Sequence, residues 1–335
     1  MKGRWRSVIG IALSAVLLWW TLRDVSLATV WGELRHSNLP LFLLATLLGT
    51  FIFPIRALRW RTILRPIAEV PLGPLWRSTA IGMMVNNVVP ARAGEIARAF
   101  ALTREAPIPF SSAIASLAVD RVFDAVTVLL LAAAAMLDPS FPRDATIAGQ
   151  PLSSWAGGAG VIVLLALASL YVLVFFPAFL VRLFELFARK VAPAIEERGR
   201  KALVAFGEGL SVLRNPKRFL AVLAWAIFHW MVNALAFWVG MKAVGIDVPY
   251  SAVLFIQALI ALGVAVPSAP GFFGLFEKLA VVSLGLFAVG APAATSWAIG
   301  YHILSFIPIT VIGAFYFARL GMRFREIQSS TEGKA

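Results

Sequence analysis

Long apolar runs separated by short polar stretches dominate this chain. The runs lie near residues 7–22, 39–55, 74–89, 110–137, 155–176, 219–241, 250–266, 272–289 and 293–318. A helix crosses the hydrocarbon core of a bilayer with about 20 predominantly apolar residues. The pattern therefore predicts an all-α, polytopic transmembrane helical bundle of about seven to nine membrane segments.

The remaining stretches predict the domain organisation. We expect residues 1–318 to form a single integral membrane domain and 319–335 to be a disordered cytoplasmic tail. The run at 7–22 has a basic start but no small-residue cleavage pattern after it, which indicates an uncleaved first helix. Residues 177–218 mix charged residues with apolar residues at helical spacing, which predicts an amphipathic stretch along the cytoplasmic membrane surface.

Composition and charge fit a membrane protein. Hydrophobic residues make up 60% of the chain and charged residues 14%, whereas soluble domains carry about 25% charged residues. The chain has no cysteine, which excludes disulfides and thiolate chemistry. The net charge of +13 comes from basic residues in short loops between apolar runs. This distribution predicts a bacterial or archaeal inner-membrane protein with both termini cytoplasmic, and no nucleic-acid partner.

Two interruptions of the apolar pattern resemble each other. NNVVPARAGEIARAF at 86–100 and AVPSAPGFFGLFEKLAV at 265–281 both run from Val-Pro through small residues and Gly to Glu. Pro90 corresponds to Pro267, Gly94 to Gly274, and Glu95 to Glu277. Two broken segments in opposite orientations would form an inverted repeat, which is typical of transporters. The alternatives are a chance similarity and simple interhelical loops.

Each break carries candidate ligand-binding residues. Basic residues on both sides of the first break predict a re-entrant element that enters and leaves on the cytoplasmic face. A helix that restarts after a break points its N-terminal amides at the gap and attracts anions such as phosphate. The candidates at the two breaks are Asn87, Arg92, Glu95, Arg98, Gly271, Gly274 and Glu277.

Charged residues also interrupt the apolar run at 110–137. Asp120 and Asp124 are four residues apart and share a helix face, and Arg121 can pair with Asp124 at a spacing of three. Ionisable groups in membrane helices usually face a partner or a wet pathway. Two interpretations remain open for these charges. They form structural ion pairs with the arginines at 56–65 or with Arg92 or Arg98, or they line a pathway. His229 and His302 lie in apolar runs, which predicts helix packing rather than a metal site, and His36 is expected in a loop; we expect no cofactor.

Several of these segments together resemble a known family. They are RALRWRTIL at 56–64, NNVVPARAGEIARAF at 86–100, DRVFD at 120–124, PSAPGFFGLFE at 267–277 and YHILSFIPITVIGAF at 301–315. The chain resembles flippase-like membrane proteins related to the transmembrane region of lysylphosphatidylglycerol synthases. It departs from them at Asp120, where the family usually has Glu, and at His302, where it often has Arg. The resemblance implies lipid handling.

We therefore expect a lipid flippase or transporter that moves an anionic or modified headgroup between leaflets. Arg59, Arg92 and Arg98 are the expected headgroup contacts, because guanidinium groups suit phosphate. Asp120, Arg121, Asp124 and Glu277 are expected to line the pathway. Alternatives are a polyprenyl-phosphate-dependent glycosyltransferase and a non-transporting partner of a separate lipid synthase. Without a catalytic motif we expect no enzyme. Membrane lipids are the expected partners, and a homo-oligomer is compatible with the sequence.

Overall fold

The structure is a computed structural model that describes residues 27–89, 93–142, 215–265 and 269–323. It also describes the pieces 146–147 and 150–151, isolated positions between 158 and 186, and Glu326. The helices in these ranges are α2 (Leu27–His36), α3 (Leu39–Leu64), α4 (Leu72–Val88), α5 (Gly94–Glu105), α6 (Phe110–Met136), α10 (Pro216–Ala243), α11 (Tyr250–Gly263), η2 (Pro270–Phe272), α12 (Leu275–Gly285) and α13 (Ala291–Arg319). Strands β1 (Thr146–Ile147) and β2 (Gln150–Pro151) pair antiparallel.

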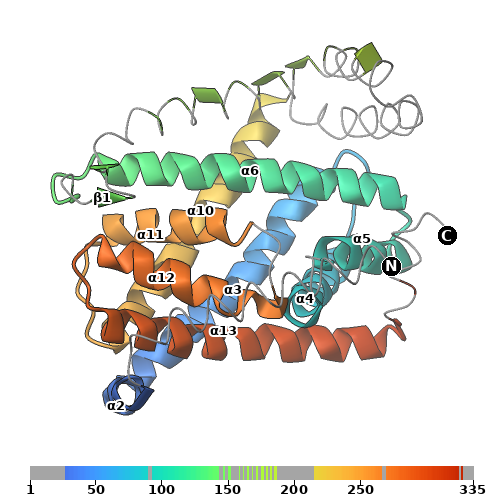
Figure 1. Cartoon of the computed structure of the whole chain (residues 1–335). Helices are drawn as coiled ribbons and strands as arrows, with labels where there is room; N and C mark the ends of the chain where they lie inside the picture. The colour runs from blue at the N-terminus through green and yellow to red at the C-terminus, as the bar shows by residue number, and fades with distance from the viewer. Residues whose placement is uncertain are drawn as a thin grey trace.

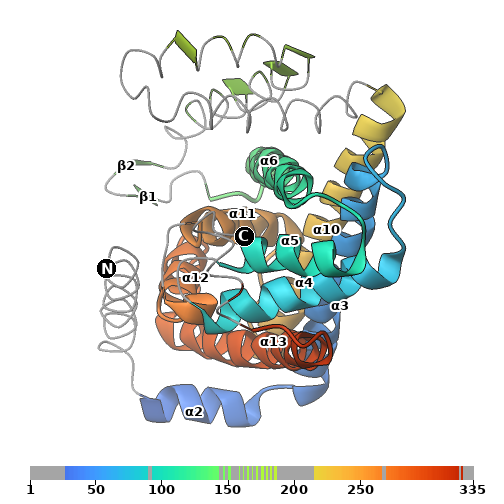
Figure 2. The same ribbon diagram turned by 90° about the vertical axis from the view of Figure 1, so that its right-hand side faces the viewer.

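The helices form a bundle in which α6 and α13 enclose the shorter elements. Figure 1 shows α6 along one side and α13 along the other, with α3 and α10 crossing steeply between them. Helices α3 and α10 pack against each other, α11 packs on α6, and α4 packs on both α5 and α13. Seen from the end, α4 and α5 lie between α6 and α13, and α2 crosses the base of the bundle (Figure 2). The helices on either side of the first break, α4 and α5, are thus held inside the bundle.

Asparagine caps begin the two helices that cross the bundle. The side chain of Asn38 accepts a hydrogen bond from the Leu41 amide at 3.1 Å at the start of α3. The side chain of Asn215 accepts one from the Lys217 amide at 3.0 Å at the start of α10. Each cap satisfies an amide that has no partner within the helix, and a proline in the first turn of both helices needs none.

The described helices confirm the predicted helical membrane bundle. Helices α3, α10 and α13 are each long and apolar enough to cross a membrane. Three predicted regions lie outside the described residues, apart from isolated positions. They are the segments at 7–22 and 155–176 and the amphipathic stretch up to residue 214. The number of membrane segments, the single-domain organisation and the side on which the termini lie therefore stay predictions, as does disorder in the tail, which is described only at 319–323 and Glu326.

A helix restarts after each break, as the sequence predicted. Helix α5 begins at Gly94, and α12 follows Gly274, which has a φ of 81°. A Cβ atom on Gly94 would collide with the carbonyl oxygen of Gly82 and with the Asn86 side chain, so glycine lets α4 and α5 approach closely. Of the predicted break residues, Pro90, Arg92 and Pro267 lie outside the described residues. The inverted relation between the breaks is not confirmed and stays a prediction.

The predicted end of one apolar run requires correction. The sequence indicated a membrane segment at 39–55, but α3 continues to Leu64. Arg56 and Arg59 consequently lie on the helix and are buried in the bundle. The carboxylates of α6 compensate the charge of these guanidinium groups, whereas an unpaired charge buried there would be strongly destabilising.

Candidate functional site

A cluster of buried charges lies where α3, α5 and α6 meet. Its members are Arg56 and Arg59 from α3, Glu95 and Arg98 from α5, and Asp120, Arg121 and Asp124 from α6. Residues three or four positions apart share a helix face, which explains how each helix presents its charges to the others. The cluster thus joins residues that are far apart in the sequence.

The inner part of the cluster is fully buried. Nε of Arg59 donates to Oδ1 of Asp120 at 2.6 Å, and Nη1 of Arg59 lies 2.8 Å from Oδ1 of Asp124. Nη1 of Arg98 reaches Oδ2 of Asp120 at 3.5 Å, and its guanidinium carbon lies 4.1 Å from the centroid of the Trp60 ring. The side chains of Arg59, Arg98 and Asp120 have no exposed surface. This geometry locks α3 and α5 onto α6.

The outer part of the cluster is more open. Nη2 of Arg121 lies 3.3 Å from Oε1 of Glu95, and Nη1 of Arg121 lies 3.1 Å from Oδ2 of Asp124. Nη2 of Arg56 lies 3.6 Å from Oδ2 of Asp124 and 3.8 Å from Oδ2 of Asp120. Arg56 therefore has only long ion pairs, whereas Arg59 has short ones.

The cluster carries an excess of positive charge. Within the described part of the chain it contains four guanidinium groups and three carboxylates, and 4 − 3 leaves one positive charge over. Nε and Nη2 of Arg56 and Nε of Arg121 have no hydrogen-bond partner among the described residues. A buried donor without an acceptor is unfavourable, so these groups would gain from an added anion.

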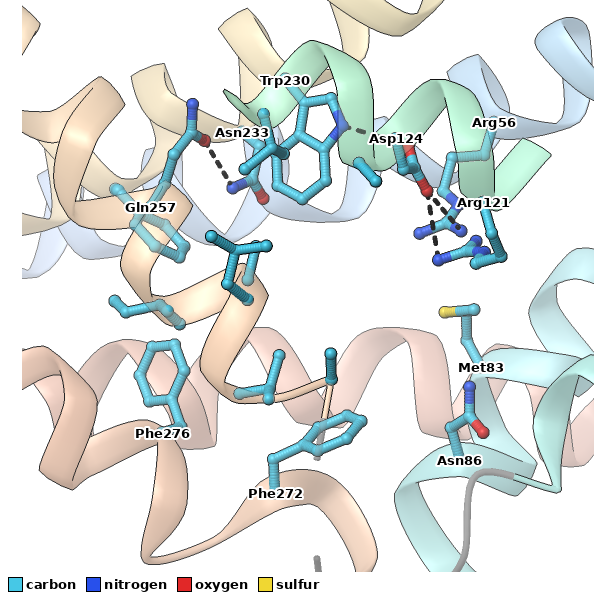
Figure 3. A pocket seen from close by; sticks show the side chains of 18 of the residues that line it. Arg56, Met83, Asn86, Arg121, Asp124, Trp230, Asn233, Gln257, Phe272 and Phe276 are labelled. Atoms are coloured by element: carbon cyan, nitrogen blue, oxygen red, sulfur yellow. Dashed lines mark hydrogen bonds and ion pairs between the residues drawn. The ribbon is translucent and has the colours of Figure 1, made fainter. Parts of the chain in front are cut away.

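A cavity of about 500 Å³ opens beside the outer part of the cluster. Its lining residues include Arg56, Met83, Asn86, Glu95, Arg121, Asp124, Trp230, Asn233, Phe237, Gln257, Ile260, Ala265, Phe272 and Phe276. Figure 3 shows Arg56 and Arg121 reaching Asp124 at one end, with Asn233 and Gln257 at the other. The rest of the lining is mostly apolar. The size and lining suit an amphipathic molecule with a polar group near the arginines.

Residues from both broken regions border this cavity. Asn86 and Glu95 flank the first break, and Ala265, Phe272 and Phe276 flank the second. The side chain of Asn86 also accepts a hydrogen bond from the Gly94 amide at 2.8 Å, which caps the start of α5. Irregular backbone at membrane depth is tolerated where it lines a cavity, and the residues that flank the two breaks fit this rule.

The second break is held by a buried hydrogen-bonded chain. Oε2 of Glu277 accepts from the Gly274 amide at 2.6 Å, and Oε1 lies 2.6 Å from Nδ1 of His302. Nε2 of His302 donates to the Gly271 carbonyl at 2.8 Å, and the imidazole stacks on Phe273 with a centroid distance of 4.4 Å. Glu277 and His302 do not line the cavity described above. In this structure they fix the shape of the break.

The structure brings together only part of the predicted site. Glu95, Arg121 and Asp124 line the cavity, whereas Arg59, Arg98 and Asp120 are buried behind it. The amide of Asn87 donates to Thr310 at 2.7 Å, so this residue ties α4 to α13. Gly271 and Gly274 shape the backbone, and Arg92 lies outside the described residues. The role of each residue in binding stays a prediction.

The sequence analysis missed five polar residues of the cavity. They are Arg56, Asn86, Trp230, Asn233 and Gln257. Arg56 could have been found, because it precedes Arg59 by three residues and so shares its helix face. Asn233 and Gln257 were single amides in two apolar helices that are distant in sequence, and their contact depends on how α10 packs on α11.

Comparison with known proteins places the chain in a family. Residues 7–313 match the family described as the lysylphosphatidylglycerol synthase TM region. A UPF0104 membrane protein of Methanothermobacter thermautotrophicus is 23% identical over 323 residues, which cover 93% of this chain and 94% of that protein. Glycosyltransferase AglD of Haloferax volcanii is 26% identical over 318 residues, or 86% of this chain. The matched region covers 50% of the length of AglD, so the chain spans about half of that protein.

These relatives correct one expectation and confirm another. The expectation that the chain is not an enzyme is wrong as it stood, because a similar protein is named a glycosyltransferase and the missing catalytic motifs do not exclude such a role. The predicted resemblance is confirmed, since the family match covers most of the chain. The protein is a helical membrane protein that belongs to the family of the lysylphosphatidylglycerol synthase TM region.

Proposed function

We propose that the protein binds an anionic lipid by its headgroup in the central cavity and moves that lipid between the leaflets. The excess positive charge of the cluster carries this proposal, since four guanidinium groups face three carboxylates beside the cavity. Arg56 and Arg121 hold donors without acceptors at the cavity wall. A phosphate group would accept from both, because its oxygens match the fork of a guanidinium group.

The rest of the cavity supports a lipid rather than a free anion. Beyond the arginines the lining is mainly apolar, with Phe237, Phe272 and Phe276 among its side chains. The apolar part of the lining can contact the acyl chains where they join the headgroup. A lipid can therefore place its headgroup at the arginines while the rest of its tails stay in the membrane. Broken helices around such a cavity are typical of transporters, in which movement of the broken elements opens the site to either side.

A second candidate function is glycosyl transfer to or from a lipid-borne phosphate. The similarity to glycosyltransferase AglD over 86% of this chain favours it. The same arginines would then hold the phosphate of the lipid, so both functions predict anion binding at the same place. A third candidate, a non-transporting partner of a separate lipid synthase, predicts binding without movement.

Reconstitution in vesicles tests the proposal. Vesicles would contain the purified chain and a fluorescent phosphatidylglycerol, and an impermeant quencher would report the lipid reaching the outer leaflet. Arg56→Gln should slow the movement by about tenfold or more, because one charge-assisted contact is worth about 1.5–3 kcal/mol. The variant leaves three guanidinium groups and three carboxylates, so the charges of the cluster become balanced and the fold should persist.

Arg61→Gln is the matched control for this experiment. Arg61 lies on the same helix as Arg56 but is exposed, so its removal should leave the movement unchanged. Movement at the wild-type rate in the Arg56 variant would contradict the proposal. Binding without movement would favour the partner function, and transfer of a sugar from a lipid-phosphate donor would favour the glycosyltransferase function.

A further inference from the structure

The cavity contains a second polar group that the charge cluster does not use. Nδ2 of Asn233 on α10 donates to Oε1 of Gln257 on α11 at 3.0 Å. Gln257 is 1% exposed, and its Nε2 has no hydrogen-bond partner among the residues that the structure describes. Both side chains line the cavity. A buried amide that still has a free donor at a cavity wall points to a group of the ligand that binds there.

The position of this amide pair relates it to the arginines. Figure 3 shows Asn233 and Gln257 at one end of the cavity and Arg56 and Arg121 at the other, with the Trp230 indole between them. Nε1 of Trp230 donates to Oδ1 of Asp124 at 3.1 Å, which fixes the ring between the two polar ends. A headgroup held at the arginines by its phosphate would therefore extend past Trp230 toward the amides.

The chemistry of the amide pair selects the kind of group. Oε1 of Gln257 already accepts from Asn233, which leaves a donor on Gln257 and the carbonyl oxygen of Asn233 as an acceptor. A hydroxyl group both donates and accepts, so hydroxyl groups can satisfy either of the two. An ammonium group only donates and would leave Nε2 of Gln257 without an acceptor. An alkyl group would satisfy neither.

We propose that Asn233 and Gln257 recognise hydroxyl groups on the headgroup, so that the substrate is a phosphodiester lipid with a polyhydroxylated headgroup. The proposal rests on the proposed function, because the arginines must first hold the phosphate. Glycerol and sugar headgroups share this chemistry. The amides act in selecting the lipid, while the arginines provide the attraction to its charge.

Binding of two lipids that differ only in hydroxyl groups tests the inference. Dioctanoyl phosphatidylglycerol and dioctanoyl phosphatidylethanol both carry a phosphodiester with one negative charge, but only the first has hydroxyls on its headgroup. The purified full chain should bind phosphatidylglycerol about tenfold more tightly, as expected for two net hydrogen bonds. Gln257→Met is nearly isosteric and should lower the affinity for phosphatidylglycerol to the level of phosphatidylethanol. The affinity for phosphatidylethanol should be the same in this variant as in the wild type.

Further variants separate this inference from the proposed function. Asn233→Leu should abolish the same preference, and thermal melting without lipid would show that either variant is folded. Arg56→Gln should weaken the binding of both lipids equally, and Arg61→Gln should weaken neither. Equal binding of both lipids to the wild type, lost in Arg56→Gln, would overturn the inference and leave the proposed function intact. Absence of binding of either lipid would overturn both.

One more arm distinguishes the sources of the hydroxyl groups. A short-chain polyprenyl phosphate that carries a hexose would be compared with dioctanoyl phosphatidylglycerol, using wild type and Gln257→Met. Tighter binding of the hexose lipid, lost in the variant, would assign the site to a sugar headgroup, and the reverse order would assign it to glycerol. A preference for either lipid that Gln257→Met leaves intact would contradict recognition by the amide pair.

Discussion

Arg59 and Arg56 provide a comparison in which net charge is constant and only geometry differs. Both lie on α3 and both pair with Asp120 and Asp124. Arg59 does so at 2.6 and 2.8 Å, and Arg56 at 3.8 and 3.6 Å. Replacing either by glutamine changes the cluster from an excess of one positive charge to a balance of three and three. Any difference in stability between Arg59→Gln and Arg56→Gln must therefore come from the quality of the contacts.

The structure gives a different magnitude for each variant. Breaking a buried ion pair by removing one partner costs about 3–5 kcal/mol, because the other charge stays buried without compensation. Arg59→Gln should approach this range, since its side chain is 0% exposed and it provides the shortest contacts of both aspartates. Arg56→Gln removes only contacts longer than normal hydrogen bonds and should cost about 1 kcal/mol. The three remaining arginines limit the loss in both cases.

Denaturant unfolding of the purified protein in mixed micelles would measure this difference. Asp120→Asn added to Arg59→Gln should recover part of the lost stability, because it removes the carboxylate that the arginine compensated. The same Asp120→Asn change alone should destabilise the wild type. Equal unfolding midpoints for the two arginine variants would refute the reasoning, since they would show that charge balance alone determines stability at this site.

Substitutions at three further positions test other parts of the fold. Gly94→Ala should destabilise the protein by about 1–3 kcal/mol, since its Cβ atom would meet the Gly82 carbonyl; unfolding curves unchanged by the substitution would show that α4 and α5 can separate at no cost. His302→Leu removes the partner of Glu277 at 2.6 Å and should cost about 1–3 kcal/mol, whereas His302→Gln, which keeps a donor, should cost less in the same assay. Hydrogen bonds from Ser251 and Ser140 lower the pKa of Asp138 to about 2. The ionised carboxylate therefore stabilises the fold above its ordinary pKa of about 4, and this contribution disappears as the pH falls through about 2. The stability difference between wild type and Asp138→Asn should be constant from pH 7 to 5 and vanish near pH 2; a difference that persists there would contradict this assignment.

The sequence determined the class of this protein and the local character of its breaks. Apolar runs of about 20 residues have the length at which a helix crosses the hydrocarbon core of a bilayer. Their length therefore predicted a helical membrane bundle. The runs at 110–137 and 293–318 match α6 and α13 closely. Gly94 and Gly274 mark the restart of a helix because only glycine fits the close approach at one and the positive φ of 81° at the other.

The tertiary structure decided which charges face the cavity. Arg59 and Arg98, the expected headgroup contacts, are turned toward Asp120, whereas Arg56 from α3 and Arg121 from α6 line the cavity. Helical spacing shows which residues share a face, but it does not show which neighbouring helix that face meets.

The same limit applies to pairs that join distant helices. Asn233 and Gln257 are unremarkable as single amides in apolar runs, and they form a polar site only because α10 packs on α11. Glu277 was expected to line the pathway, but His302 from α13 and the Gly274 amide bind both of its oxygens. Polar residues in an apolar sequence thus predict that these groups have partners, because unpaired polar groups are unfavourable in hydrocarbon. The packing of the helices determines which partners they contact.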